Sequence, residues 1–169
     1  NYCKKYKTLN DMSEKFTGKN RPISSYLLKS KVSNSASTDT IFVTDGGGTN
    51  VYSSYQSLHL KRGQRQVLST GICSMGSGLP EAIGACFATQ NKHVVCFVGD
   101  GSFPFNVQEL QVIKDLQLPI TIVVLSNGGY TSIKTTQEDF LEGALVGSVG
   151  GIKADNVHLL DVSKTAAAF

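Results

Sequence analysis

The chain has no tryptophan, four prolines and four cysteines among 169 residues. The cysteines never stand at C-x-x-C spacing, which argues against a zinc site. The most apolar run, residues 120–125, is much shorter than the roughly 20 residues of a membrane-spanning helix. A net charge of +3, scattered over the chain, argues against nucleic-acid binding. We therefore expect a protein without membrane or nucleic-acid partners.

What is present fits one folded domain. Hydrophobic residues make up 40 % of the sequence, which is enough for a packed core. Cys86 and Cys96 fall in apolar runs and are expected in that core, so a reducing, cytoplasmic setting is favoured. Residues 1–37 are polar and are interpreted as a helical lead-in and linker, and residues 38–169 as the domain itself. The chain begins with Asn1 and stops inside a helix-like stretch, so we expect a fragment of a longer polypeptide, truncated at its C-terminus.

From residue 40 onward, short apolar runs alternate with helical stretches. The runs are residues 41–44, 66–70, 94–98 and 120–125, and each ends in Gly, Asp, Ser or Asn. Continuous apolar strands that alternate with helices are typical of parallel sheets covered on both faces. The pattern therefore predicts the α/β class: a three-layer open sheet, mostly parallel, with helices on both faces.

The helix expected after residue 102 has a recognisable start. Asn106 is predicted to cap it, with Glu109 three residues on as in a capping box. Its apolar positions, which we expect to face the sheet, are Val107, Leu110, Ile113 and Leu116. A strand-helix-strand unit of this length usually joins neighbouring parallel strands, so Asp100 and Asn127 should meet at the carboxyl ends of two strands.

The pair formed by Asp100 and Asn127 is the strongest chemical signal. Magnesium prefers oxygen ligands, typically one or two carboxylates together with phosphate oxygens and water. Asp100 offers a carboxylate, Asn127 an amide oxygen, and the carbonyl of Gly129 a third ligand. Alone, Gly-Asp-Gly is an ordinary turn, but here it follows a buried strand. The residues expected to let a phosphate approach the backbone are Gly99, Gly101 and Ser102.

These residues also carry a family resemblance. Gly99-Asp100-Gly101-Ser102 followed by Asn127 resembles the signature of thiamine-diphosphate enzymes. Residues 71–84, GICSMGSGLPEAIG, and residues 106–110, NVQEL, are similar to the acetolactate synthase and pyruvate oxidase group. The resemblance runs from about residue 40 to 145 and weakly to the end. It implies the C-terminal, diphosphate-binding domain of that family.

The resemblance implies roles for particular residues. Asp100, Asn127 and the carbonyl of Gly129 match the Mg²⁺ ligands. Met75 matches the bulky residue that bends the cofactor from below, and backbone groups of residues 73 and 75 match those that hold the aminopyrimidine ring. The implied thiamine diphosphate contacts are Gly48, Thr49, Asn50, Cys73, Ser74, Met75, Gly99, Asp100, Gly101, Ser102, Asn127, Gly129, Tyr130 and Thr131.

Three positions depart from the family pattern. Cys73 stands where the group often has Gly, and Gly128 replaces a common second Asn. Thr136 falls where acetolactate synthases proper carry a Trp that shapes the pocket for the second keto acid. Strict acetohydroxyacid synthesis for branched-chain amino acids is therefore in doubt. Residues 129–140 look closer to acetolactate-synthase-like proteins of surface-polysaccharide pathways.

The resemblance also implies what this chain does not hold. The family activates its cofactor with a glutamate of a separate pyrimidine-binding domain, usually on a partner subunit. The sequence around each glutamate of this chain differs from that around the activating glutamate of the family. No catalytic residue is therefore expected in this segment, and the segment alone should be inactive. The intact protein is expected to be a homodimer or homotetramer that decarboxylates and carboligates a 2-keto acid such as pyruvate. A decarboxylase or oxidase of the same family is the alternative.

Two hypotheses of other classes stay open. Gly76-Ser77-Gly78 after a strand resembles part of a nicotinamide-dinucleotide motif, although Glu81 occupies a position where helix packing wants a small residue. A non-catalytic relative could keep the fold as an assembly module. No P-loop motif G-x-x-x-x-G-K-[ST] occurs, which argues against a nucleotide triphosphatase.

Overall fold

A computed structural model describes residues 23–69, 71–142, 144–149 and 157–169. Four parallel strands form one sheet in the order β2-β1-β3-β4. Their bounds are Ile41–Thr44 for β1, Arg65–Leu68 for β2, Val94–Gly99 for β3 and Ile120–Leu125 for β4. The strand runs expected from the sequence are therefore confirmed, with β2 beginning and ending earlier than its predicted run.

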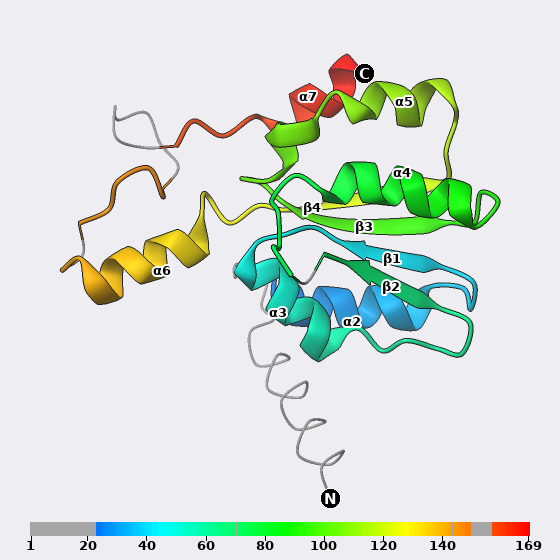
Figure 1. Cartoon of the computed structure of the whole chain (residues 1–169), viewed down its shortest axis with the longest axis horizontal. Helices are drawn as coiled ribbons and strands as arrows, with labels where there is room; N and C mark the ends of the chain where they lie inside the picture. The colour runs from blue at the N-terminus through cyan, green and yellow to red at the C-terminus, as the bar shows by residue number, and fades with distance from the viewer. Residues whose placement is uncertain (1–22, 70, 143, 150–156) are drawn as a thin grey trace, which may run out of the picture.

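Helices cover both faces of the sheet (Figure 1). On one face lie α2 (Ser25–Ser35) and α3 (Gly48–Ser57), and on the other α4 (Gly78–Ala88), α5 (Glu109–Asp115) and α7 (Val162–Ala168). Helix α6 (Thr131–Phe140) extends away from the sheet beyond the end of β4. The predicted three-layer α/β fold is confirmed.

The core is divided by the sheet, because the side chains of a strand point alternately to its two faces. Ile41, Val43, Val94 and Cys96 pack under α4 with its Cys86. On the opposite face Phe42 and Phe97 stack with ring centroids 6.4 Å apart, and residues of α2 and its C-terminal end pack against them. The placement of Cys86 and Cys96 in the core is confirmed, since both are fully buried.

The segment between β3 and β4 corrects two expectations. Asn106 does not cap α5, because residues 103–106 form a 3₁₀ turn and the helix begins only at Glu109. The Asn106 side chain instead donates a 2.8 Å hydrogen bond to the carbonyl of Gly76. Of the positions expected to face the sheet, Leu110 is buried with Val107 and Ile113 packed beside it, as predicted. Leu116 differs, because it follows the last residue of α5 and is 54 % exposed.

Helix α2 lies in the stretch that the sequence assigned to a lead-in. Ser24 caps it by accepting a hydrogen bond from Leu27 N, and the helix packs along α3. Lys29 and Ser33 on this helix are fully buried. Within the residues that the structure describes, no helix is both long and apolar enough to cross a membrane.

Candidate cofactor and metal site

The carboxyl ends of β3 and β4 bring Asp100 and Asn127 together. The two strands are paired in parallel up to Gly99 opposite Leu125, so the residues that follow leave the sheet side by side. Asp100 is 4 % exposed, and its Oδ2 accepts hydrogen bonds from the backbone N–H of Asn127 at 2.9 Å and of Gly128 at 2.8 Å. The hydroxyl of Ser126 adds a longer one at 3.3 Å. The turn after β4 is thus built around this carboxylate.

Only one of the two carboxylate oxygens of Asp100 is used in this way. Oδ2 receives all three hydrogen bonds, whereas no described residue donates one to Oδ1. The three hydrogen bonds to Oδ2 fix the orientation of the side chain, while Oδ1 keeps its capacity to accept from a ligand.

A cavity of about 460 Å³ opens at this edge of the sheet. Its wall includes every implied cofactor contact except Cys73 and Ser74. Apolar side chains complete it, among them Leu28 of α2, Met75 and Ile133 of α6. Chain segments that lie far apart in sequence, from Ile23 to Ile133, therefore share one concave surface, as ligand sites of open α/β sheets do.

Two helix N-termini point their first turns into this cavity. Gly48 to Asn50 begin α3, and Thr131 and Ser132 begin α6. Neither helix has a side-chain cap or an acidic residue in its first turn, so the partial positive charge of each end is not neutralised locally. Helix N-termini attract anions because of their free N–H groups and the helix dipole. The cavity wall is therefore suited to a diphosphate.

The donor set also fits a magnesium ion. A carboxylate, an amide oxygen and a backbone carbonyl are hard oxygen ligands, and a Mg²⁺ site normally adds phosphate oxygens and water. Among the described residues no three His, Cys, Asp or Glu side chains gather as a metal cluster, so such an ion would need oxygens from its ligand as well. A side chain on Gly101 would displace the Tyr130 ring, since a Cβ atom there would lie 2.3 Å from it.

The loop before α4 forms the other wall of the site. Met75 lines the cavity, while a Cβ atom on Gly46 would lie 2.2 Å from the carbonyl oxygen of Cys73 and 2.4 Å from that of Ser74. Cys73 has a φ of 52°, a left-handed conformation that costs a residue with a side chain about 1 kcal/mol. That conformation gives a physical reason why Gly suits this position.

Asp45 holds this loop in place. It is fully buried, and its Oδ1 accepts hydrogen bonds from Gly46 N at 2.7 Å and Gly78 N at 3.2 Å, while Oδ2 accepts one from Gly76 N at 3.3 Å. Burial raises the pKa of Asp45 to about 6, and the three backbone N–H groups oppose that rise. Asp45 thus ties the end of β1 to the start of α4.

The same contacts weigh against a nicotinamide-dinucleotide site. Such a site needs the backbone N–H groups of its Gly-rich turn to face pyrophosphate. Here the N–H groups of Gly76 and Gly78 donate to the Asp45 carboxylate, and neither glycine lines the cavity. A carboxylate in the place of the pyrophosphate would also repel it.

Asn50 lies at the cavity wall with its side chain already engaged. Its Nδ2 donates to the carbonyls of Asp45 at 3.0 Å and Phe97 at 2.9 Å, and its Oδ1 accepts from Lys29 Nζ at 2.7 Å. Because both polar atoms of its side chain already have partners, the implied contact of Asn50 with diphosphate would have to come from its backbone. Thr49 and Gly48 beside it remain at the wall as the sequence implied.

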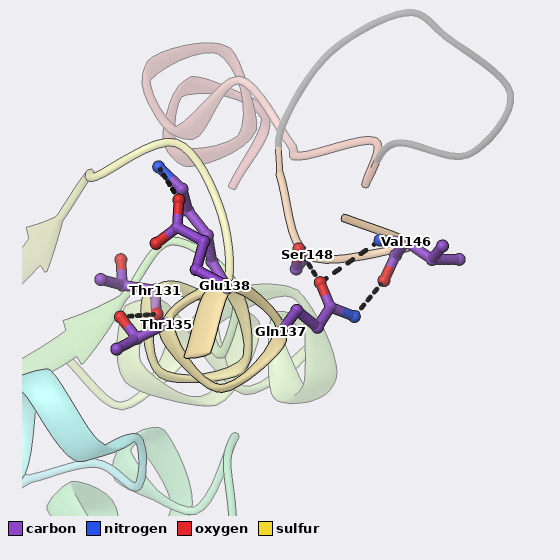
Figure 2. A network of polar contacts seen from close by, with 7 residues as sticks. Thr131, Thr135, Gln137, Glu138, Val146 and Ser148 are labelled. Atoms are coloured by element: carbon purple, nitrogen blue, oxygen red, sulfur yellow. Dashed lines mark hydrogen bonds and ion pairs between the residues drawn. The ribbon is translucent and has the colours of Figure 1, made fainter. Parts of the chain in front are cut away.

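A polar clamp orders the segment that follows α6 (Figure 2). The Gln137 amide pairs with both backbone groups of Val146: Nε2 donates to the carbonyl at 2.8 Å, and Oε1 accepts from N–H at 3.3 Å. Oε1 also accepts from the Ser148 hydroxyl at 2.6 Å, and the Ser148 carbonyl accepts from Tyr130 N–H at 2.8 Å. Gly129 and Val149 form an antiparallel bridge beside it. Gln137 thereby braces the turn that carries Gly129.

We expect Gln137→Leu to loosen that turn. The substitution removes three side-chain hydrogen bonds, each contributing about 1 kcal/mol, so backbone hydrogen exchange at Tyr130 should accelerate by about tenfold or more. Hydrogen-exchange mass spectrometry or NMR of the full-length protein measures this. Glu138→Gln is the matched control on the same helix, because it breaks only the exposed 3.6 Å ion pair with Lys134. Equal exchange in both variants would contradict the clamp.

Comparison with known proteins now identifies the family. Residues 45–169 match the model of the thiamine pyrophosphate enzyme, C-terminal TPP binding domain. The chain belongs to this family. The resemblance expected from the sequence is therefore confirmed, and thiamine diphosphate is the cofactor to which this fold and this site correspond.

Acetolactate synthases are among its relatives. The chain is 38 % identical over 116 residues to the acetolactate synthase isozyme 2 large subunit of Escherichia coli (strain K12), covering 69 % of this chain and 21 % of that protein. It is 36 % identical over 104 residues to the acetolactate synthase large subunit of Lactococcus lactis subsp. lactis (strain IL1403), covering 62 % and 18 %. The chain thus spans about a fifth of the length of these relatives.

A solved structure supports the fold independently. The thiamine diphosphate-dependent 4-hydroxybenzoylformate decarboxylase of Rhodococcus jostii RHA1 superimposes with a TM-score of 0.71 over 90 % of this chain and 27 % of that one. At 22 % sequence identity the likeness concerns the fold alone.

Three residues of the site were not identified from the sequence. Asp45 directly follows a buried strand, as Asp100 does, and that shared position was a usable signal. Gln137 looks like any exposed helix residue, and Lys29 lies in a polar stretch that resembles a linker. Their contacts join segments 9 and 21 residues apart, which no local pattern indicates.

Proposed function

We propose that the full-length protein is a thiamine-diphosphate- and Mg²⁺-dependent enzyme that decarboxylates and carboligates a 2-keto acid such as pyruvate, in the manner of acetolactate synthases. This chain supplies the part of the site that binds the diphosphate and the metal ion. The proposal rests on the family to which the chain belongs and on its acetolactate synthase relatives.

One observation carries the metal-binding half of the proposal. The Asp100 carboxylate is held through Oδ2 by the backbone of the turn that bears Asn127, and Asp100, Asn127 and Gly129 all line the same cavity. Three oxygen donors at one edge, opposite two uncapped helix ends, suit a cation that carries a diphosphate.

The chain's own residues bind and orient rather than react. Asp100, Asn127 and Gly129 would hold the ion, the first turns of α3 and α6 would receive phosphate oxygens, and Met75 would support the ring system. When bound, thiamine diphosphate supplies a nucleophilic carbon and an electron sink for the loss of carbon dioxide. The apolar wall formed by Leu28, Met75 and Ile133 would keep water from the reacting carbon.

The remaining parts of the active site are assigned to other segments. We propose a homodimer or homotetramer in the cytoplasm, in which the activating glutamate comes from a pyrimidine-binding domain outside this chain. None of the glutamates among the described residues lines the cavity, which supports that assignment. The segment alone is then expected to bind cofactor at most and to be inactive.

The test is a binding and turnover experiment on the full-length protein. Isothermal titration with thiamine diphosphate should show binding that requires Mg²⁺ and disappears with excess chelator. With pyruvate, acetolactate should form, whereas acetaldehyde or acetate as the product would favour a decarboxylase or oxidase. Mg²⁺-dependent binding without turnover of any 2-keto acid would support a non-catalytic assembly module. No binding of the cofactor would refute the proposal.

A further inference from the structure

Lys29 of α2 is a buried cation next to the cofactor cavity. Its side chain is fully buried, and Nζ lies within hydrogen-bonding distance of four oxygens. They are Asn50 O at 2.6 Å, Asn50 Oδ1 at 2.7 Å, Ser53 Oγ at 2.7 Å and Ser54 Oγ at 2.8 Å. Below it lies the face of the Phe97 ring, with 5.2 Å from Nζ to the ring centroid.

All of these partners are neutral. Helix α3 contributes an amide, a backbone carbonyl and two hydroxyls, and β3 contributes an aromatic ring. The Asp45 carboxylate at the end of β1 accepts hydrogen bonds from Gly46, Gly76 and Gly78 instead. Lys31 on α2 itself is exposed. The lysines seen in ion pairs are Lys134 within α6 and Lys164 at the start of α7. In the part of the chain that the structure describes, no carboxylate neutralises Lys29.

A lysine in such surroundings costs free energy, because an ammonium loses its hydration on burial. Burial accordingly lowers the pKa of Lys29 to about 7. A buried charge without a counter-ion is normally retained only where something else uses it. An anion bound in the adjacent cavity would interact favourably with this charge.

Asn50 connects Lys29 to the wall of that cavity. Its Oδ1 and backbone carbonyl accept from Nζ, while its Nδ2 donates to the carbonyls of Asp45, which directly follows β1, and of Phe97 on β3. Asn50 is also in the first turn of α3, one of the two uncapped helix ends. The ammonium therefore lies directly behind the surface that faces the anion.

We propose that Lys29 is a positioning residue that sets the affinity of this cavity for a diphosphate, by fixing Asn50 and the first turn of α3 and by supplying the counter-charge that the anion lacks. This inference rests on the proposed function, because it assumes that the cavity binds a diphosphate. It adds a residue outside the part of the chain that matches the family model, which begins at residue 45.

The titration of Lys29 makes the inference testable. An anion in the cavity favours the protonated amine and raises its pKa, and by linkage the protonated protein binds the anion more tightly. A coupling of one pKa unit corresponds to tenfold in affinity. The contribution of Lys29 should then be large below pH 7 and vanish well above pH 8.

The experiment measures the affinity of the full-length protein for pyrophosphate with Mg²⁺, and separately for thiamine diphosphate with Mg²⁺, at pH 6.5 and pH 9. Lys29→Met keeps the apolar stem over Phe97 and removes the charge. We expect it to bind about tenfold more weakly than the wild type at pH 6.5 and within about twofold of it at pH 9. Lys31→Met, an exposed lysine on the same helix, is the matched control and should equal the wild type at both pH values.

A second measurement follows the proton itself. At pH 7.5, binding of magnesium pyrophosphate should take up about half a proton more in the wild type than in Lys29→Met, measured by calorimetry in buffers of different ionisation enthalpy; the comparison cancels the protons of pyrophosphate. A loss of affinity that is equal at both pH values, equal proton uptake in the two proteins, or no binding of magnesium pyrophosphate would each overturn the inference. If pyrophosphate shows the pH-dependent difference but thiamine diphosphate does not bind, the proposed function fails while the role of Lys29 stands.

Discussion

Asp100→Asn is expected to weaken Mg²⁺-dependent binding of thiamine diphosphate by at least about 100-fold. The amide oxygen of the new side chain can take the place of Oδ2 and accept the same hydrogen bonds from the backbone of Asn127 and Gly128. Its NH₂ group then occupies the position of Oδ1, where it cannot ligate a cation. Outer-shell substitutions at metal sites already cost about 10- to 100-fold, so loss of a ligand should cost at least that much.

Titration of the full-length variant with thiamine diphosphate at several Mg²⁺ concentrations measures this effect. Asp139→Asn makes the same chemical change at an exposed position of α6 and should leave the affinity unchanged. The thermal unfolding temperature of Asp100→Asn without cofactor should stay close to that of the wild type, since the turn keeps its hydrogen bonds. Wild-type affinity in Asp100→Asn would remove the metal-ligand assignment.

Asp45→Ala is expected to produce the largest loss of stability. It leaves the buried N–H groups of Gly46, Gly76 and Gly78 without their acceptor, and an unpaired buried donor costs about 1–3 kcal/mol. Relief from the buried carboxylate offsets part of this, so the free energy of opening should fall by about 3 kcal/mol. Native-state hydrogen exchange of β1 and β3 in the full-length protein reports it. The loop with Met75 should loosen at the same time and weaken cofactor binding.

The pH dependence of the wild type provides a separate check on Asp45. The pKa of this carboxyl is raised by burial to about 6, above its ordinary value, so its stabilising contribution is complete below about pH 4 and is lost as the pH rises through 6. Between pH 5 and pH 7.5 the wild type should therefore lose about 1 kcal/mol more stability than Asp45→Asn, which does not titrate.

Parallel pH profiles of the wild type and Asp45→Asn would show that the Asp45 carboxyl does not titrate in this range. Asp115→Asn, at the C-terminal end of α5, serves as the control and should show the same pH dependence of stability as the wild type. If Asp45→Ala were as stable as the wild type, the N–H groups of Gly76 and Gly78 would have found other acceptors.

The apolar strands, their order along the chain and the meeting of Asp100 with Asn127 could be predicted from the sequence. Each depends on local patterns, namely continuous apolar runs and the residues that directly follow them. The crossover rule then places β3 and β4 side by side, as the structure confirms. The family resemblance rested on the same local segments and is confirmed by the family match.

The start of α5 could not be predicted in the same way. Asn106 satisfies the local rule for a helix cap, but its amide makes a hydrogen bond to Gly76, 30 residues away. A 3₁₀ turn over residues 103–106 places Phe103 in the core and delays the helix. Tertiary contacts outweighed a capping preference of about 1 kcal/mol.

Sequence alone thus determined the fold class, the family and the strand ends that carry the proposed metal ligands, because these follow from residues close together in the chain. Only the tertiary structure showed which side chains hold the loops at the carboxyl edge of the sheet in place. Lys29, Asp45 and Gln137 act through partners on other elements, and their polar groups gain importance only once burial has removed water. Burial and long-range pairing arise from the packed chain, so no local pattern of these residues indicates them.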